Sequence, residues 1–368
     1  MDTMRIDFAN LQYQYRLYKK EIDAAVQSVL DSSTYIMGPH IEQLEQELAA
    51  FTGASHCIAC SSGTDALQLS LMALGIGPGD QVITTPFTFI ATAEMIAHLK
   101  ARPVFVDIDP ETYNIDARKI EQAITGKTKA ILPVSLYGQP ADMEEINRLA
   151  KQHGLPVIED AAQSFGAEYK SEKSCNLSTL GCTSFFPAKP LGCYGDGGAV
   201  FTSSLSLADT IRSLRVHGQS RHYEHQHIGL GARMDTLQAA VLLAKLPHYA
   251  REIVQRQEVA RTYTRLLADA LPTPLVRADR TSVWAQYSIQ VPGREQVREH
   301  LSQAGIPTAV HYPKPVHLQE CFAYLGYGPG DFPVAEEVST RIMSLPMNPF
   351  LPAEDLEYVC TRLLEATE

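Results

Sequence analysis

A single lysine, Lys189, stands among apolar and small residues near the middle of the chain. The segments on either side of it, 183–187 and 197–203, have the pattern of strands, so we expect the lysine in the turn between them. Burial lowers the pKa of an amine, and a neutral amine can attack an aldehyde. Lys189 is therefore a candidate nucleophile. The alternative is a solvated lysine in a glycine-rich turn, because most lysines are exposed.

The segment 61–64, Ser-Ser-Gly-Thr, joins a predicted strand to the start of a predicted helix. Free backbone N–H groups and the helix dipole make such a start a binding site for anions. Gly63 allows close approach of a ligand to the backbone, and the Thr64 hydroxyl adds a donor. The alternative is an ordinary cap, in which the hydroxyls satisfy their own helix.

Asp160 follows a short apolar strand at 156–159. In α/β sheets the carboxyl ends of strands face the ligand crevice, so Asp160 is placed to hold a cationic partner there. Capping of a following helix is the alternative. An acid, an amine and a helix N-terminus at one crevice fit a pyridoxal phosphate site, in which the amine forms a Schiff base and the acid meets the ring nitrogen.

Five motifs occur in a fixed order along the chain. They are Ser-Ser-Gly-Thr-Asp-Ala-Leu (61–67), Pro-Phe-Thr-Phe-Ile-Ala-Thr (86–92), Glu-Asp-Ala-Ala-Gln (159–163), Ser-Phe-Phe-Pro-Ala-Lys (184–189) and Tyr-Gly-Asp-Gly-Gly-Ala (194–199). Together they resemble the sugar aminotransferases of the DegT/DnrJ/EryC1/StrS family, and the likeness extends to 233–239 and 344–349. The resemblance implies a fold-type I enzyme that uses pyridoxal 5′-phosphate. It also implies a homodimer with active sites at the subunit interface.

The resemblance assigns roles to individual residues. Lys189 would hold the cofactor as a Schiff base and then carry the proton, and Asp160 would pair with the pyridinium nitrogen. The other implied cofactor contacts are Gly63, Thr64 and Ser184 for the phosphate, Gln163 for the ring hydroxyl and Phe89 for the ring face. For Phe89, packing in the core is the alternative.

The substrate side departs from the family pattern at one position. Many relatives carry an asparagine, which reaches the neighbouring subunit's phosphate, two residues before the arginine of an Arg-x-Asp motif; here Gly231 precedes Arg233. A backbone N–H substitutes for that contact, or the contact is absent. Substrate-side residues by resemblance are Met37, Arg233, His311 and Tyr312. A salt bridge at a helix start is the alternative for Arg233, and a proline-rich connector is the alternative for 311–315.

The order of elements predicts how these residues are positioned. Strand and helix patterns alternate between 57 and 203, with about seven strands, so we expect an α/β fold with a mostly parallel sheet covered by helices on both faces. A strongly helical region follows residue 235, and then a smaller α+β region. We therefore predict a large cofactor-binding domain with an N-terminal arm at 1–249 and a small C-terminal domain at 250–368.

Composition limits the class of protein. The 368 residues are 45% hydrophobic and 20% charged, and the net charge of −11 argues against general affinity for nucleic acid or anionic membranes. No apolar run approaches a membrane span, and residues 1–7 lack the apolar core of a signal peptide, so we expect a cytoplasmic protein. The seven cysteines include a Cys-x-x-Cys pair at 57–60, but without a second pair we predict no metal site.

The combined prediction is an aminotransferase that takes its amino group from glutamate. Among sugar aminotransferases the stretch at 184–198 most resembles enzymes that aminate C3 of UDP-2-acetamido-2-deoxy-3-keto-glucuronic acid for O-antigen or related surface polysaccharides. Three alternatives remain: C3 or C4 amination of another dTDP- or UDP-linked keto-sugar, a cofactor-binding regulator without turnover, and a sugar dehydratase. In the dehydratases of this family histidine replaces the Schiff-base lysine, so Lys189 argues against the last.

Overall fold

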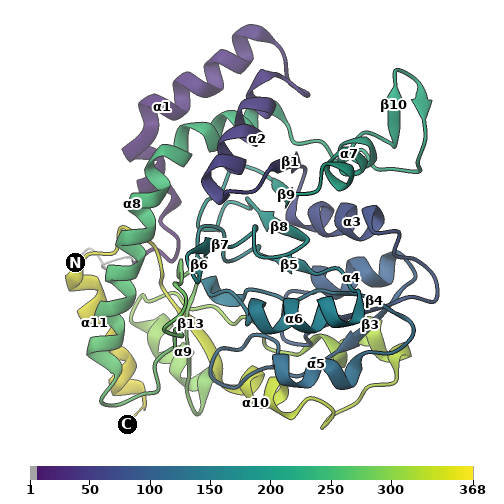
Figure 1. Ribbon diagram of the computed structural model, residues 1–368. Helices are drawn as coiled ribbons and strands as arrows, with labels where there is room; N and C mark the ends of the chain where they lie inside the picture. The colour runs from purple at the N-terminus through teal and green to yellow at the C-terminus, as the bar shows by residue number, and fades with distance from the viewer. Residues whose placement is uncertain (1–5, 368) are drawn as a thin grey trace.

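The computed structural model describes residues 6–367, and its centre is a seven-stranded sheet (Figure 1). The strands are β1 (His56–Cys60), β2 (Gln81–Thr84), β3 (Arg102–Phe105), β4 (Thr128–Ile131), β5 (Ile158–Asp160), β8 (Leu180–Ser184) and β9 (Gly198–Thr202). Residues 1–5 lie outside the described part. The sequence-based statement about a signal peptide concerned residues 1–7, so most of that segment is not described here.

Pairing joins these strands in the order β1-β9-β8-β5-β4-β2-β3. The ladders give β1-β9-β8-β5 and β3-β2-β4, and parallel bridges from Ile131 to Val157 and from Val134 to Asp160 connect β4 with β5. Only β9 runs against its neighbours, since it is antiparallel to both β1 and β8 while the other ladders are parallel. The predicted mostly parallel sheet of about seven strands is confirmed.

Helices cover both faces of the sheet because its strands are apolar on both sides. Along β1, Ile58 packs in one core and its neighbours Cys57 and Ala59 in another, as the alternation of side chains requires. The first face is covered by α3 (Gly63–Ala73), α4 (Ala91–His98) and α7 (Leu205–Leu214). The second is covered by α2 (Pro39–Thr52), α5 (Ala117–Ala123), α6 (Met143–His153) and the start of α8 (Thr236–Leu267).

The Cys-x-x-Cys pair lies on β1 with its two thiols in different cores. Cys57 belongs to the core under α2, and Cys60 to the core under α3. Burial raises the pKa of both thiols, that of Cys60 to about 12. The two sulfurs therefore act as small apolar groups on opposite faces of the sheet.

The long helix α8 joins the sheet to the C-terminal part of the chain. It continues through Pro247, and α1 (Leu11–Ser32) lies beside it (Figure 1). The predicted division after residue 249 falls within α8 and stays a prediction. The C-terminal part has its own core around β12 (Tyr287–Gln290), α9 (Arg294–Gln303), β13 (Ile342–Leu345) and α11 (Ala353–Thr367).

Shorter elements complete the fold. These are η1 (Leu136–Gly138), the pairs β6 (Glu168–Tyr169) with β7 (Glu172–Lys173) and β10 (Gln219–Arg221) with β11 (Glu224–His225), then η2 (Val316–Leu318), η3 (Glu320–Leu325) and α10 (Pro333–Arg341). The β10–β11 hairpin projects from the body of the molecule beyond α7 (Figure 1). Among the described helices none is both long and apolar enough to span a membrane.

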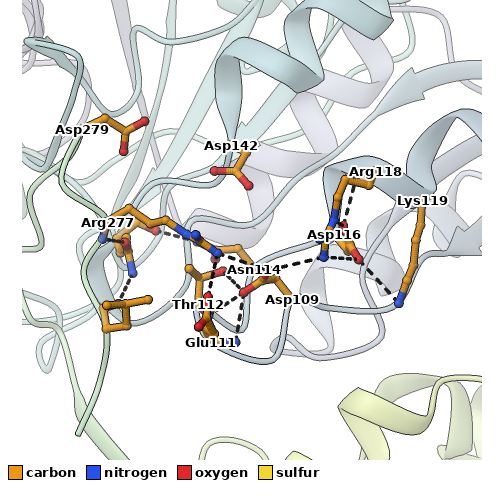
Figure 2. Close-up of polar contacts among 12 residues, drawn as sticks. Asp109, Glu111, Thr112, Asn114, Asp116, Arg118, Lys119, Asp142, Arg277 and Asp279 are labelled. Carbon is orange, nitrogen blue, oxygen red and sulfur yellow. Dashed lines mark hydrogen bonds and ion pairs between the residues drawn. The ribbon is translucent and has the colours of Figure 1, made fainter.

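A polar cluster around Asp109 ties the segment after α8 to the sheet (Figure 2). One carboxylate oxygen of Asp109 accepts the amides of Glu111 and Thr112 at 3.0 Å each. The other lies 3.4 Å from a guanidinium nitrogen of Arg277 and 3.7 Å from one of Arg118. Because the Asp109 side chain is only 12% exposed, this acid orders the loop as well as pairing charges.

Candidate active site

Lys189 lies in the turn between β8 and β9, as predicted. The turn is closed by short backbone contacts: the Lys189 amide donates to the Phe186 carbonyl at 2.8 Å, and the Cys193 amide to the Phe185 carbonyl at 2.8 Å. Gly192 is required here, because a Cβ at that position would stand 2.4 Å from the Pro187 carbonyl oxygen. This folding directs one lysine to a fixed place at the end of β8.

The surroundings of Lys189 favour its neutral form. Burial lowers the pKa of its amine, and the nearby charge of Asp160 acts in the opposite direction without a hydrogen bond between them. A lysine held in this way is more reactive toward a carbonyl than a solvated one. The alternative of a fully solvated surface lysine does not match this structure.

A second lysine, Lys245 on α8, supports the same turn. Its Nζ donates to the Gly192 carbonyl and lies 5.4 Å from the centre of the Tyr194 ring. It is 3% exposed, and burial lowers its pKa to about 8. No motif indicates this contact, because 53 residues separate the two partners.

Asp160 ends β5 and is 6% exposed. Its Oδ2 accepts a hydrogen bond from Thr92 Oγ1 at 2.8 Å, and its Oδ1 accepts one from the Ala162 amide at 3.2 Å. Burial raises the pKa of the carboxyl, while these donors and the charge of Lys189 oppose that rise. No helix begins after Asp160, so the alternative role as a helix cap does not apply. A buried acid that no cationic side chain of residues 6–367 bonds is well suited to a protonated ring nitrogen.

The start of α3 forms a cradle with β8 and β9. Ser62 caps the helix by accepting the Asp65 amide at 3.0 Å, so the N–H groups of Gly63 and Thr64 keep no partner within residues 6–367. The cradle is narrow: a Cβ on Gly63 would stand 2.6 Å from the Ser184 Cβ, and one on Gly198 would meet the Ser62 carbonyl at 2.4 Å. Two free amides and the Ser184 hydroxyl thus converge where an anion would bind.

A prediction follows for Gly63. Gly63→Ala should weaken binding of the cofactor phosphate by about 10-fold or more, because the new methyl group must displace Ser184 from the cradle. Titration of the cofactor-free protein with pyridoxal phosphate measures this. Gly77→Ala is the matched control, since a Cβ there meets nothing within 4 Å. Equal affinities in both variants would exclude the cradle as the phosphate site.

Gln163 connects the Asp160 segment to the C-terminal part. Its Oε1 accepts the Tyr137 amide at 2.7 Å, and its Nε2 donates to the Tyr312 hydroxyl at 3.2 Å. Tyr137 in turn donates its hydroxyl to the carbonyl of His311. Gln163, Tyr312 and His311 therefore lie in one network, although they are far apart in the sequence.

Phe89 lies at the open side of this network. Its side chain is 56% exposed, so the alternative of core packing is wrong. Its ring centre is 6.2 Å from that of Tyr312 and tilted by 41°. A large exposed aromatic ring beside polar residues is available to cover a flat ligand.

His311 is held neutral by its position. Its Nδ1 is 3.0 Å from Ser344 Oγ, and burial together with the charge of Lys189 lowers the pKa of the imidazole to about 4. At neutral pH it is therefore a hydrogen-bonding group for a substrate rather than a cation.

This low pKa gives a pH-dependent stability. The unfolded chain, with a histidine pKa near 6.5, binds more protons than the folded chain between pH 4 and 6.5, so His311 should make stability rise with pH across that window, by up to about 3 kcal/mol. Urea unfolding of the wild type and of His311→Gln at several pH values measures the effect. An identical pH dependence in both proteins would contradict it.

The remaining substrate-side candidates gather at the start of α8. Gly38, next to Met37, donates its amide to Thr236 Oγ1 at 3.2 Å, and the Met37 side chain is 42% exposed. Arg233 makes no ion pair within the described residues, so the alternative of a salt bridge at the helix start is not seen. At Gly231 a Cβ would lie 3.1 Å from the His217 ring. Met37 and Arg233 do not line the cavity at Lys189.

Several supporting residues were not predicted. Thr92, inside a motif used for the resemblance, bonds Asp160 directly. Glu159 is fully buried next to Asp160 and accepts hydrogen bonds from Ser135 and Ser174 at 2.7 Å each. The position of Glu159 inside an apolar strand could have indicated this arrangement, because a buried carboxylate requires hydrogen-bond donors around it.

The family model for DegT/DnrJ/EryC1/StrS aminotransferases matches residues 17–364. The chain belongs to this family. The resemblance and the prediction of an aminotransferase are thereby confirmed.

Two curated relatives align with this aminotransferase over nearly the full length of both chains. The UDP-2-acetamido-2-deoxy-3-oxo-D-glucuronate aminotransferase of Pseudomonas aeruginosa is 52% identical over 97% of this chain and 99% of its own. A pleiotropic regulatory protein of Geobacillus stearothermophilus is 47% identical, with 98% of each chain covered.

Solved structures confirm the fold class. A DegT DnrJ EryC1 StrS aminotransferase from Brucella abortus has a TM-score of 0.96 and 42% identity, covering 98% of this chain and 99% of its own. NtdA from Bacillus subtilis, solved with the bound cofactor PMP, has a TM-score of 0.90 and 29% identity, covering 99% of this chain and 86% of its own. The predicted fold-type I architecture is the one that these aminotransferases share.

The residues of this chain fit pyridoxal 5′-phosphate. The cradle at Gly63 supplies free amides for a phosphate, Asp160 supplies a buried acid without a bonded cation, and Lys189 supplies an amine with a lowered pKa. Asp160 ends β5, and Lys189 follows the neighbouring parallel strand β8, so both residues come after the carboxyl ends of paired strands and can serve one ligand.

Proposed function

We propose that this protein transfers an amino group from glutamate to C3 of UDP-2-acetamido-2-deoxy-3-keto-glucuronic acid, using pyridoxal 5′-phosphate. The choice of this substrate rests on the 52% identity, over 97% of the chain, to the aminotransferase named for that sugar. The solved relatives named for their PLP and PMP forms confirm the predicted cofactor for the family. The product would serve synthesis of O-antigen or a related surface polysaccharide, and we propose that the enzyme works in the cytoplasm.

The chemistry divides between the cofactor and the chain. When bound, pyridoxal phosphate supplies an aldehyde that accepts an amino group and a ring that draws electrons from the neighbouring carbon. Lys189 then moves the proton at that carbon, in one direction with glutamate and in the other with the keto-sugar. The turn that carries Lys189, supported by Lys245, keeps the amine in place for both halves.

Other residues hold and orient the cofactor. The Asp160 carboxylate would keep the ring nitrogen protonated, and Thr92 fixes the orientation of that carboxylate. The amides of Gly63 and Thr64 together with Ser184 would hold the phosphate, Gln163 would hydrogen-bond the ring hydroxyl, and Phe89 would cover the ring. Tyr312, His311 and Arg233 provide hydrogen bonds and charge for the sugar and its carboxylate, and Met37 contacts the nucleotide.

The substrate is tested by product analysis. Incubation with glutamate and a panel of UDP- and dTDP-linked keto-sugars should yield a new amine at C3 of the glucuronic acid sugar, located by NMR. If the enzyme prefers another keto-sugar, or if the new amine is at C4, the proposed substrate is wrong. A yellow protein that keeps its colour with every amino donor would favour a regulator without turnover, a class suggested by the name of the Geobacillus relative.

We propose a homodimer in which each active site takes residues from both subunits. Support comes from large apolar side chains that are at least half exposed: Phe89 beside Tyr312, Phe186 in the turn that carries Lys189, and Ile36, which pairs with Asp235 before α8. Mixing Lys189→Ala with Arg233→Ala subunits should then restore up to about a quarter of wild-type activity, because mixed dimers rebuild one intact site. If refolded mixtures stay as inactive as either variant, the two residues act within one subunit.

A further inference from the structure

A cavity of about 70 Å³ lies beside Lys189, between the N-terminal arm, α8 and the C-terminal part. Its polar lining is Gln14, Lys189, Arg256, Gln286 and His311, and the rest of its wall is apolar. Arg256 brings a guanidinium to this cavity and Lys189 an amine with a lowered pKa, and no Asp or Glu of residues 6–367 lines it. The space suits a small group such as a carboxylate with a few waters, and it is too small for a nucleotide.

Arg256 is the unusual residue of this wall. It is 6% exposed, and its Nη1 donates to the carbonyls of Trp284 at 3.1 Å and Met347 at 3.4 Å. Its Nε is buried without a partner, and within residues 6–367 no carboxylate forms an ion pair with it. Burial lowers the pKa of the guanidinium. A buried cation that lacks a counter-ion is costly, and a carboxylate in the cavity would supply one.

The acid nearest to Arg256 along α8 is already hydrogen-bonded to another side chain. Glu252, one turn before Arg256 on α8, accepts the Gln14 Nε2 on both carboxylate oxygens, at 2.9 and 3.0 Å. The Oε1 atoms of Gln14 and Gln286 are also buried without partners. The Gln286 amide makes no side-chain hydrogen bond within residues 6–367, so it can turn its NH₂ group toward a carboxylate. The Gln14 NH₂ group is held by Glu252, so the Gln14 oxygen can only accept a hydrogen bond, from an amine or a water. Folded proteins leave few buried polar atoms unpaired, so three on the wall of one cavity indicate a missing ligand.

We propose that this cavity binds a carboxylate of the amino donor through Arg256, while the donor's amino group lies at Lys189. A guanidinium matches a carboxylate better than a point charge does, because two parallel N–H groups meet the two oxygens. The inference deepens the proposed function and rests on it, since it places the donor of that same reaction. The carboxylate of the keto-sugar has the same chemistry, so the experiment must separate the two sources.

The two half-reactions are measured separately on the enzyme loaded with cofactor. Arg256→Gln should raise the apparent Kd for L-glutamate by roughly 10–100-fold in stopped-flow absorbance, the loss expected for a charged hydrogen bond. The reaction of the aminated enzyme with the keto-sugar should change by less than about 2-fold. Calorimetry with glutarate, which has the carboxylates but no amine, should show the same weakening without turnover.

Two further variants complete the test. Arg256→Lys keeps the charge but not the fork, so glutamate and glutarate should bind with intermediate affinity. Arg233→Gln should give the reverse pattern, with the sugar half-reaction affected and the glutamate half-reaction intact. Thermal unfolding checks that each variant is folded, and if Arg256→Gln is not, Arg256→Lys decides by its glutarate affinity.

The outcomes are distinct. A folded Arg256→Gln with unchanged glutamate and glutarate affinity overturns the site, and so does a variant in which only the sugar step weakens. A wild-type enzyme that does not react with glutamate refutes the proposed function instead, while glutarate binding still reports on the cavity.

Discussion

Lys189→Ala is expected to lower the rate of amino transfer by roughly 10³–10⁴-fold, because the variant loses the group that moves the proton in both half-reactions. The variant should still bind pyridoxal phosphate, since the cradle at Gly63 and the acid Asp160 remain. Single-turnover absorbance with glutamate measures the rate, and reduction with borohydride followed by mass analysis measures the covalent attachment, which should disappear.

The control for this experiment is Lys151→Ala, an exposed lysine on α6 that makes no ion pair within residues 6–367. It should behave as the wild type in both measurements. Retention of full activity by Lys189→Ala would refute the assigned role of the lysine. Loss of cofactor binding as well would mean that the lysine serves chiefly to retain the cofactor.

Asp160→Asn should reduce turnover by about 10²–10³-fold, the range seen when one preorganised electrostatic group is removed from an active site. The amide has the shape of the carboxylate and can still meet Thr92, but it carries no charge to keep the ring nitrogen protonated. Steady-state kinetics gives the loss, and it should appear in kcat more than in KM because the ring is weakened as an electron acceptor.

The matched substitution is Asp269→Asn, at an exposed acid without an ion pair in the described chain. Unchanged kinetics are expected there. If Asp160→Asn kept wild-type turnover, the charge of Asp160 would have no part in the reaction, and its burial would need another explanation.

Much of the catalytic side could be inferred from the sequence, because its parts are local. The glycine-rich turn fixes Lys189 between two short strands, and the Ser-Ser-Gly-Thr segment forms a helix start within four residues. Asp160 comes directly after an apolar strand, and the direction of parallel strands places such residues at one edge. The alternation of strand and helix predicted the sheet for the same reason.

The substrate side was harder to infer because its contacts join distant segments. Tyr312 reaches Gln163 across 149 residues, and Lys245 reaches the turn after Lys189 across 53. Phe89 was open to interpretation as a core residue, and only the packed structure shows it exposed. The charge state of His311 likewise depends on burial, which a motif does not record.

The sequence by itself determined the family and the α/β sheet and supplied the residues that we propose for the cofactor side, since short motifs and strand polarity are properties of neighbouring residues. The tertiary structure decided which distant side chains share a cavity and which buried groups lack partners. Arg256 belongs to no motif, yet the fold places it on the same cavity as Lys189, with its Nε unpaired and without an ion pair in residues 6–367. Burial and missing partners are properties of the whole packed chain, and they are the reason that we propose a carboxylate beside this arginine.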